Sequence, residues 1–146
     1  MNDNSQAASV VAIMLCTGHR RPMQQVEEAR AIEGFGLEGD RHARAESSRQ
    51  VLLMADETIE ELGLRRGDVK ENITTRGLEH SSLVRGQRLE VGHEVVLEIT
   101  KPCEPCSRME EIREGLQNEL LGRRGILARV VQGGVIRVGD QILTSG

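Results

Sequence analysis

The sequence predicts a small, mostly β fold, a closed or partly closed β-barrel with a few short helices. Strand-sized apolar segments recur at short intervals, 16 glycines punctuate the 146 residues, and helical patterns are few and short. Many short strands separated by turn residues are typical of barrels and sandwiches. The length fits one domain, which we place at residues 9–146 behind a flexible, polar N-terminal tail of residues 1–8.

The individual elements follow from hydrophobic periodicity and turn residues. Strands are expected at residues 9–17, 49–54, 71–75, 88–91, 94–100, 126–132, 135–138 and 140–143. Residues 26–32 fit a strand or a short helix, and the pattern does not decide. A short helix is expected over 55–62, ending at Gly63, and a helical stretch over 107–121 is interrupted by Gly115. The pair Gly133-Gly134 suits a tight hairpin between the strands that flank it.

Composition excludes several classes of function. Acidic residues outnumber basic ones, 23 to 19, and the net charge of −4 disfavours nucleic acid and anionic membranes as partners. With one Phe and no Tyr or Trp, the core must be aliphatic, and base-stacking platforms are disfavoured. The apolar run at 10–15 is too short for a signal peptide or a membrane span. We therefore expect a cytoplasmic protein.

The basic residues are almost all arginine, since Lys70 and Lys101 are the only lysines. Arginine binds phosphate and carboxylate through a planar fork, which suits an anionic ligand. A GC-rich genome, which favours Arg codons, explains the bias equally well. So few lysines argue against a Schiff base of this chain with pyridoxal phosphate.

One segment carries two of the three cysteines and two of the three prolines. Cys103 and Cys106 have C-x-x-C spacing, and Pro102 and Pro105 flank Cys103, so the chain is expected to leave the sheet here. A helical pattern starts just after Cys106, and Arg108 follows; both favour the thiolate, which binds metal or attacks sulfur. We interpret Cys106 as a reactive thiol. The alternative is two small apolar residues in a buried turn.

Two other meanings of this spacing fit less well. A thioredoxin-like dithiol needs a βαβ framework, which the β-rich pattern does not supply. A structural zinc site needs four ligands, whereas Cys103 and Cys106 give two and the four histidines are scattered. Cys16, the third cysteine, falls within the first strand pattern, and we interpret it as a core residue.

A glycine-rich segment at 36–42 is the second unusual feature. Spaced glycines let backbone N–H groups approach an anion closely. If the chain is extended after Gly39, Asp40 and His42 point to one face. The competing interpretation is a β-turn that ends in polar surface residues.

Together these segments resemble the MOSC family, named for the molybdenum cofactor sulfurase C-terminal domain, in its short, stand-alone bacterial form. The matching pieces, in chain order, are GLEGDRH at 36–42, RQVLL at 49–53, ENITTRGL at 71–78, Pro105-Cys106, and GGVIRVGD at 133–140. The resemblance runs from about residue 8 to the end. It implies a small barrel-like fold in the cytoplasm.

The resemblance also implies one key cysteine, proposed in the family to carry sulfur or to ligate molybdenum, which corresponds to Cys106. Cys103 falls where relatives often carry a basic residue, which leaves room for a dithiol or persulfide relay between the two. We expect Cys106 to be essential and Cys103 to assist it. The expected surface for the molybdenum cofactor (molybdopterin) consists of Gly39, Asp40, Arg41, His42, Asn72, Arg76 and Arg108.

Three functions are carried forward. The first is a MOSC domain that handles the molybdenum cofactor or its sulfur through Cys106, as a metal ligand or as a persulfide carrier. Its implied partners are a cysteine desulfurase or other sulfur donor and a molybdoenzyme or metal-cluster acceptor. The second is a molybdenum-dependent reductase of N-hydroxylated compounds, although such relatives generally carry extra domains. The third is a non-catalytic module that binds a metal or an anion.

Overall fold

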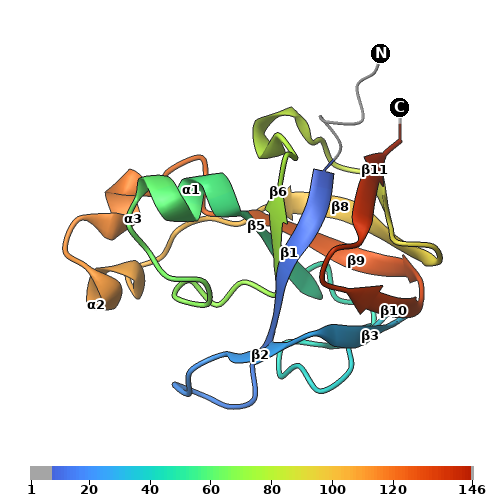
Figure 1. Cartoon of the computed structure of the whole chain (residues 1–146). Helices are drawn as coiled ribbons and strands as arrows, with labels where there is room; N and C mark the ends of the chain where they lie inside the picture. Colours follow the sequence, from blue (N-terminus) through green and yellow to red (C-terminus); the bar gives the residue numbers. More distant parts are fainter. Residues whose placement is uncertain (1–7, 146) are drawn as a thin grey trace.

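Seven strands close into a β-barrel in the computed structural model, which describes residues 8–145 (Figure 1). The order around the barrel is β11-β7-β8-β9-β5-β6-β1, and β1 returns to pair with β11. Strand β2 adds to the other end of β1, and β10, β3 and β4 form a separate three-stranded sheet. The predicted fold class, a small mostly β barrel with short helices, is confirmed.

The elements agree closely with the segments expected from the sequence. The strands are β1 Ala8–Leu15, β2 Gln24–Val26, β3 Glu28–Ile32, β4 Gly36–Leu37, β5 Val51–Ala55, β6 Ile73–Arg76, β7 Arg88–Val91, β8 Val95–Pro102, β9 Ile126–Gln132, β10 Gly134–Arg137 and β11 Gln141–Thr144. The helices are α1 Asp56–Glu61, α2 Met109–Ile112 and α3 Leu116–Glu119, with the 3-10 helix η2 at His80–Ser82.

Alternation along the strands fills the barrel with aliphatic side chains. In β8, Val95, Leu97 and Ile99 are buried while the residues between them are partly exposed. They join one cluster that draws on most strands, as expected for a barrel of this size. The single aromatic residue, Phe35, is partly exposed, so the core holds no aromatic side chain.

The three helices form a small second layer outside the barrel beside β5 (Figure 1). Met54 points out from β5 and packs against residues of the helices and of the loop before β6. The other buried members of this cluster are Ile59, Val69, Met109, Leu116 and Leu120. Through this cluster, the segment that follows Cys106 is fixed against the barrel wall.

Strands β5 and β6 run parallel, whereas the other described pairings are antiparallel. A parallel pair needs a crossover connection, and α1 and the loop after it supply one. Both strands therefore end at the same edge of the barrel, where α1 begins on one side and residues 77–83 on the other.

Two expectations of the sequence analysis need correction. The strands around Gly133-Gly134 form no hairpin: β9 pairs with β5 and β8, and β10 pairs with β3. Gly133 instead permits a close backbone approach, because a Cβ there would lie 2.7 Å from the carbonyl oxygen of Ala31. Strand β8 continues to Pro102, two residues beyond the expected end at residue 100.

The undecided segment at 26–32 is extended, since it contains β3. The expected tail, residues 1–8, lies outside the described residues except for Ala8, which begins β1. Within residues 8–145, none of the helices has the length and apolar character needed to cross a membrane.

Gly125 offers a test of the packing between β9 and β5. Its φ is +124°, and a Cβ would lie 2.6 Å from the carbonyl oxygen of Leu53. We expect Gly125→Ala to lower the free energy of unfolding by about 2–4 kcal/mol, measured by urea denaturation. Gly122→Ala is the control, because its φ is also positive but its Cβ would meet open space; it should cost about 1 kcal/mol or less. Equal losses in the two variants would contradict this account.

Candidate functional site

Asn72 joins three segments at the point where β6 begins. Its side-chain oxygen accepts from the backbone N–H of Leu52 on β5 at 3.0 Å, and its amide nitrogen donates to the carbonyl of Met14 on β1 at 3.1 Å. The same nitrogen donates to Oδ1 of Asp40 at 3.1 Å. Asn72 is 1% exposed. Each hydrogen-bonding atom of its side chain is thus used to connect backbone segments.

Asp40 extends this junction to the end of β1. Its Oδ1 also accepts from the backbone N–H of Cys16 at 2.8 Å, and the N–H of Arg41 donates to the carbonyl of Cys16 at 2.7 Å. Within the described chain, Oδ2 of Asp40 is buried and has no hydrogen-bond partner. The glycine-rich segment is therefore held against the loop that follows β1. Asp40 thus accepts hydrogen bonds from both Asn72 and Cys16 and connects these two segments.

The loop after β1 carries positive charge and contacts both other segments. Arg20 forms an ion pair with Glu111 on α2 at 3.3 Å. Local loss of hydration, and then the charges of Arg41, Arg108 and Arg20, hold the pKa of the exposed His19 below its usual value. Arg41 belongs to the glycine-rich segment and Arg108 to the turn before α2, so these charges act on His19 from two other parts of the chain. We call His19, Arg20, Arg41 and Arg108 the basic cluster.

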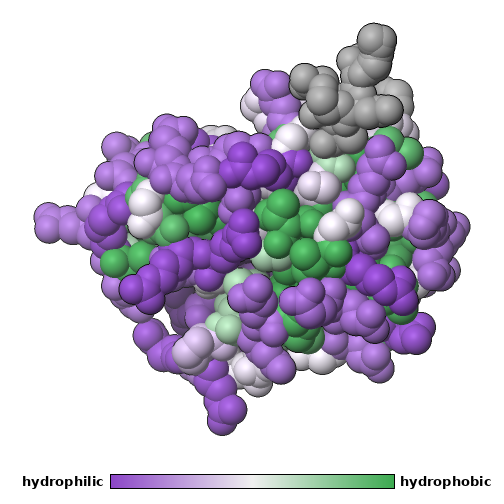
Figure 2. Space-filling model, in the orientation of Figure 1, coloured by the Kyte–Doolittle hydropathy of each residue, from purple (hydrophilic) through white to green (hydrophobic). Residues whose placement is uncertain are grey.

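Cys106 is linked to the basic cluster through Arg108 in the same turn. It is exposed, stands two residues before Arg108, and opens the turn that leads into α2. Polar residues cover the loops around α2 and β2 on this side of the molecule (Figures 1 and 2). The other two cysteines are buried, so among the described residues only Cys106 presents an accessible thiol.

The helix after Cys106 differs from the one expected. The stretch 107–121 forms two four-residue helices, and Gly115, with φ +87°, separates them. A four-residue helix sums too few peptide dipoles to act strongly on a thiol at its N-terminus. The expected contribution of a helix N-terminus at Cys106 is therefore small, and Arg108 is the nearby basic residue in the sequence.

Cys103 and Cys16 are packing residues in this geometry. Cys103 contacts Leu52 and Leu127 in a small apolar cluster, and its N–H donates to the carbonyl of Gly125 at 2.9 Å. Cys16 is 4% exposed, as predicted for a core residue. All three cysteines are free thiols, so pairing of Cys103 with Cys106 stays a prediction.

Among the expected cofactor-binding residues, Arg76 pairs with α1, and Asp40 and His42 do not share one face. Arg76 binds acidic residues of α1, with Nη2 at 3.3 Å from Asp56 and 2.7 Å from Glu60. Hydrogen bonds from Arg66 and then Arg76 hold the pKa of Asp56 below its usual value, although burial opposes them. His42 is exposed while Asp40 is buried, because a turn replaces the extended chain after Gly39.

Sequence reasoning missed three residues on this side. His19 and Arg20 belong to the basic cluster, and Nζ of Lys70 donates to the carbonyl of Arg21 at 2.9 Å. Arg20 and Lys70 both have a positive φ, 59° and 65°, a backbone conformation that residues other than glycine rarely adopt. The basic run at residues 19–21, directly after the first strand, is the sequence signal that could have indicated this cluster. The backbone strain had no signature in the sequence.

Within residues 8–145, His, Cys, Asp and Glu form no group of three or more that would hold a metal ion. The described residues therefore offer no metal site built from protein ligands alone. This arrangement differs from a structural zinc site, which takes its four ligands from the protein.

The family model described as the MOSC domain matches residues 40–143. The chain belongs to the MOSC family. The match begins at Asp40 and includes Asn72, Cys106 and most of the barrel. The resemblance seen in the sequence motifs is therefore confirmed. The comparison with curated protein sequences found no match.

Solved structures agree on the fold. The chain superposes on the YuaD protein from Bacillus subtilis with a TM-score of 0.78 and 19% identity, covering 93% of this chain and 94% of that one. YiiM from Geobacillus stearothermophilus gives 0.75 and 19%, covering 95% and 75%. YiiM from Escherichia coli gives 0.69 and 18%, covering 94% and 70%. At this identity the likeness establishes the barrel architecture.

Asn72 provides a direct test of the junction beneath the site. Asn72→Ala removes three side-chain hydrogen bonds and leaves buried backbone groups unpaired, so we expect a loss of about 3 kcal/mol in the free energy of unfolding. Thr74→Val is the control on the same strand, because Oγ1 of Thr74 is buried without a partner. It should be neutral or slightly stabilising. Similar losses in both variants would contradict the role of Asn72.

Proposed function

We propose that this MOSC protein handles the molybdenum cofactor or its sulfur through Cys106. The observation that supports this proposal is that Cys106 has an accessible thiol and lies two residues before Arg108 of the basic cluster. The residues of this cluster come from three segments that are far apart in sequence. A thiolate suits a soft, sulfur-rich metal centre. Arginine side chains suit an anionic phosphate.

The residues present fit this cofactor. The donor set combines a single soft ligand, Cys106, with the guanidinium groups of Arg41 and Arg108, and it contains no competing cage of hard oxygen ligands. Cys106 would hold the metal, and the basic cluster would face the phosphate. When bound, the cofactor supplies oxo-transfer and redox chemistry. Asn72 and Asp40 support the loops from below.

The same site also suits a sulfur carrier. The thiolate of Cys106 would attack the outer sulfur of a donor persulfide, whose S–S bond breaks and releases the donor as a thiolate. The product is a persulfide on Cys106, and nearby arginines favour its negative charge. A cysteine desulfurase would serve as the donor, and a molybdoenzyme or a metal cluster as the acceptor.

One experiment separates the two versions. The full chain and Cys106→Ser are purified from bacteria that make the cofactor, then analysed for molybdenum and for pterin fluorescence. A ligand role predicts that both signals accompany the wild type and fall about tenfold or more in Cys106→Ser. A carrier role predicts no retained metal. It predicts instead the added mass of one sulfur atom on Cys106 after exposure to a cysteine desulfurase and cysteine.

Two controls complete this test. Cys103→Ala should retain the wild-type result in the ligand version, because Cys103 packs against Leu52 and Leu127. A host strain blocked in cofactor synthesis should remove the pterin signal. Wild-type protein that holds neither metal nor pterin and gains no sulfur would refute the proposal.

The basic cluster makes a separate prediction about charge. Cys106 should react faster with anionic iodoacetate, relative to neutral iodoacetamide, than an isolated thiol does. We expect Arg108→Gln to lower this ratio of rates about threefold at low salt, and high salt to abolish the difference. Mass spectrometry of the Cys106 peptide gives both rates.

Arg85→Gln is the matched control, because Arg85 is an exposed arginine on the loop before β7. It should leave the ratio unchanged. If Arg108→Gln and Arg85→Gln behave alike, the basic cluster does not act on Cys106.

A further inference from the structure

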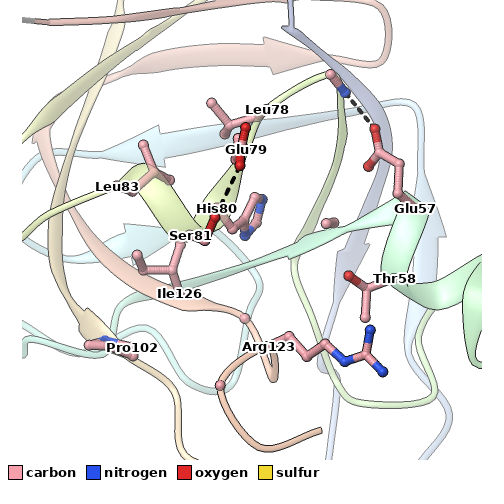
Figure 3. A pocket seen from close by; sticks show the side chains of 14 residues that line it. Glu57, Thr58, Leu78, Glu79, His80, Ser81, Leu83, Pro102, Arg123 and Ile126 are labelled. Carbon is pink, nitrogen blue, oxygen red and sulfur yellow. Dashed lines mark hydrogen bonds between the residues drawn. The ribbon is translucent and has the colours of Figure 1, made fainter.

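A second cleft lies at the edge of the barrel where the parallel strands β5 and β6 end (Figure 3). Its volume is about 630 Å³, within the usual range for small-molecule sites. The walls come from α1, from the loop and 3-10 helix after β6, and from the segment before β9. None of the cofactor residues expected from the sequence lines it.

The inner wall of the cleft is apolar. Leu78, Leu83, Pro102 and Ile126 contribute to it, and the three residues other than Pro102 are also buried members of the barrel core. Figure 3 shows Leu83 and Ile126 on one side of the His80 ring and Glu57 and Thr58 of α1 on the other. A flat apolar ligand can therefore lie against one wall while a polar group faces the ring.

His80 is the polar group at the centre. Its Nε2 lies 2.8 Å from Oγ1 of Thr75, which is buried. Among the described residues, the hydrogen bond of the ring is made by Nε2, and Nδ1 takes no part in it. Burial lowers the pKa of His80 to about 4, so the ring is neutral at physiological pH. One nitrogen is thus fixed by the protein and the other remains available.

The charged residues of the rim already have partners. Glu57 accepts from the N–H of Gly77 at 2.8 Å, and Glu79 accepts from the hydroxyl of Ser81 at 3.3 Å. Arg123 forms an ion pair with Glu61 at 2.9 Å. Because the one cation is neutralised and two carboxylates remain on the rim, an anionic ligand would be disfavoured.

We propose that this cleft binds a small neutral molecule with a planar apolar body and a carboxamide or lactam group that hydrogen-bonds to Nδ1 of His80. An amide carries both a donor and an acceptor. It therefore matches His80 whichever tautomer Thr75 selects. This inference goes beyond the proposed function, because it needs neither Cys106 nor a cofactor.

The test uses three probes of similar shape and different charge: benzamide, benzoate and benzylamine. Each is titrated into the isotopically labelled full chain, and the backbone amides and histidine rings are followed by NMR. Benzamide should shift His80 and the lining residues, with a Kd of about 1–10 mM for a ligand of this size. Benzoate should bind at least about tenfold more weakly, because the rim carboxylates of Glu57 and Glu79 disfavour an anion. Benzylamine should also bind at least about tenfold more weakly, because its ammonium would lose hydration beside carboxylates that already accept hydrogen bonds.

Variants connect binding to the cleft. His80→Ala should weaken benzamide binding at least about fivefold, the order expected for one lost hydrogen bond. His93→Gln, which changes an exposed histidine between β7 and β8, should not. Thr58→Arg blocks the mouth from α1 and should abolish binding without touching the His80–Thr75 contact, so it serves if His80→Ala fails to fold. Cys106→Ser should bind benzamide normally.

Three results would overturn the inference. They are no cleft shifts with benzamide, equal binding of benzoate or benzylamine, and benzamide binding that survives Thr58→Arg. The test measures benzamide binding to the cofactor-free protein. A negative result therefore leaves the proposed role of Cys106 intact, and a negative result for Cys106 leaves the proposal for the cleft intact.

Discussion

The fold depends on the buried side chain of Asn72. It connects β1 and β5, which do not pair with each other, by hydrogen bonds to the backbone of both strands. Strand β6 begins one residue later and separates these two strands for the rest of their length. Before that point the backbone groups of Leu52 and Met14 face the gap, and the amide of Asn72 satisfies both. An amide suits this position because it donates and accepts without charge.

That junction also determines where the loops lie. Asn72 binds Asp40, Asp40 binds the N–H of Cys16, and the loop after β1 then reaches α2 through the Arg20–Glu111 ion pair. The chain of contacts runs from the barrel wall to the segment that carries Cys106. Exposed ion pairs contribute little to stability by themselves. The buried amide and carboxylate therefore place the loops, and the basic side chains supply the charge.

The crossover between β5 and β6 creates the second region of interest. Parallel strands end at the same edge, so α1 and the loop after β6 face each other across a gap that no strand fills. His80 lies in this gap with Thr75 beneath it. The cleft and the basic cluster thus arise from different constraints, one from strand direction and one from a side-chain junction. Pro102 lines the cleft and precedes Cys103, so the chain between the two regions is short.

Much of the fold could be predicted from the sequence, because strand alternation and glycine-rich turns are local signals. The buried face of β8, the short helix α1 and the aliphatic core follow directly from residue order. The pairing of β10 with β3 could not be predicted, since Gly133-Gly134 fits a hairpin locally and the competing partner lies about a hundred residues away.

The same division applies to the site. The sequence by itself determined the family and singled out Cys106 as the candidate reactive thiol. It assigned Asp40 and Asn72 to one expected surface, and the tertiary structure showed that their side chains are hydrogen-bonded to each other. Only the tertiary structure decided that Cys103 is buried, that Arg76 binds α1, and that His19 and Arg20 join Arg41 and Arg108. Residue types and spacing encode what a segment can do. Burial and charge partners depend on which distant segments come into contact. Here the hydrogen bonds of Asn72 bring β1, β5 and the segment of Asp40 together.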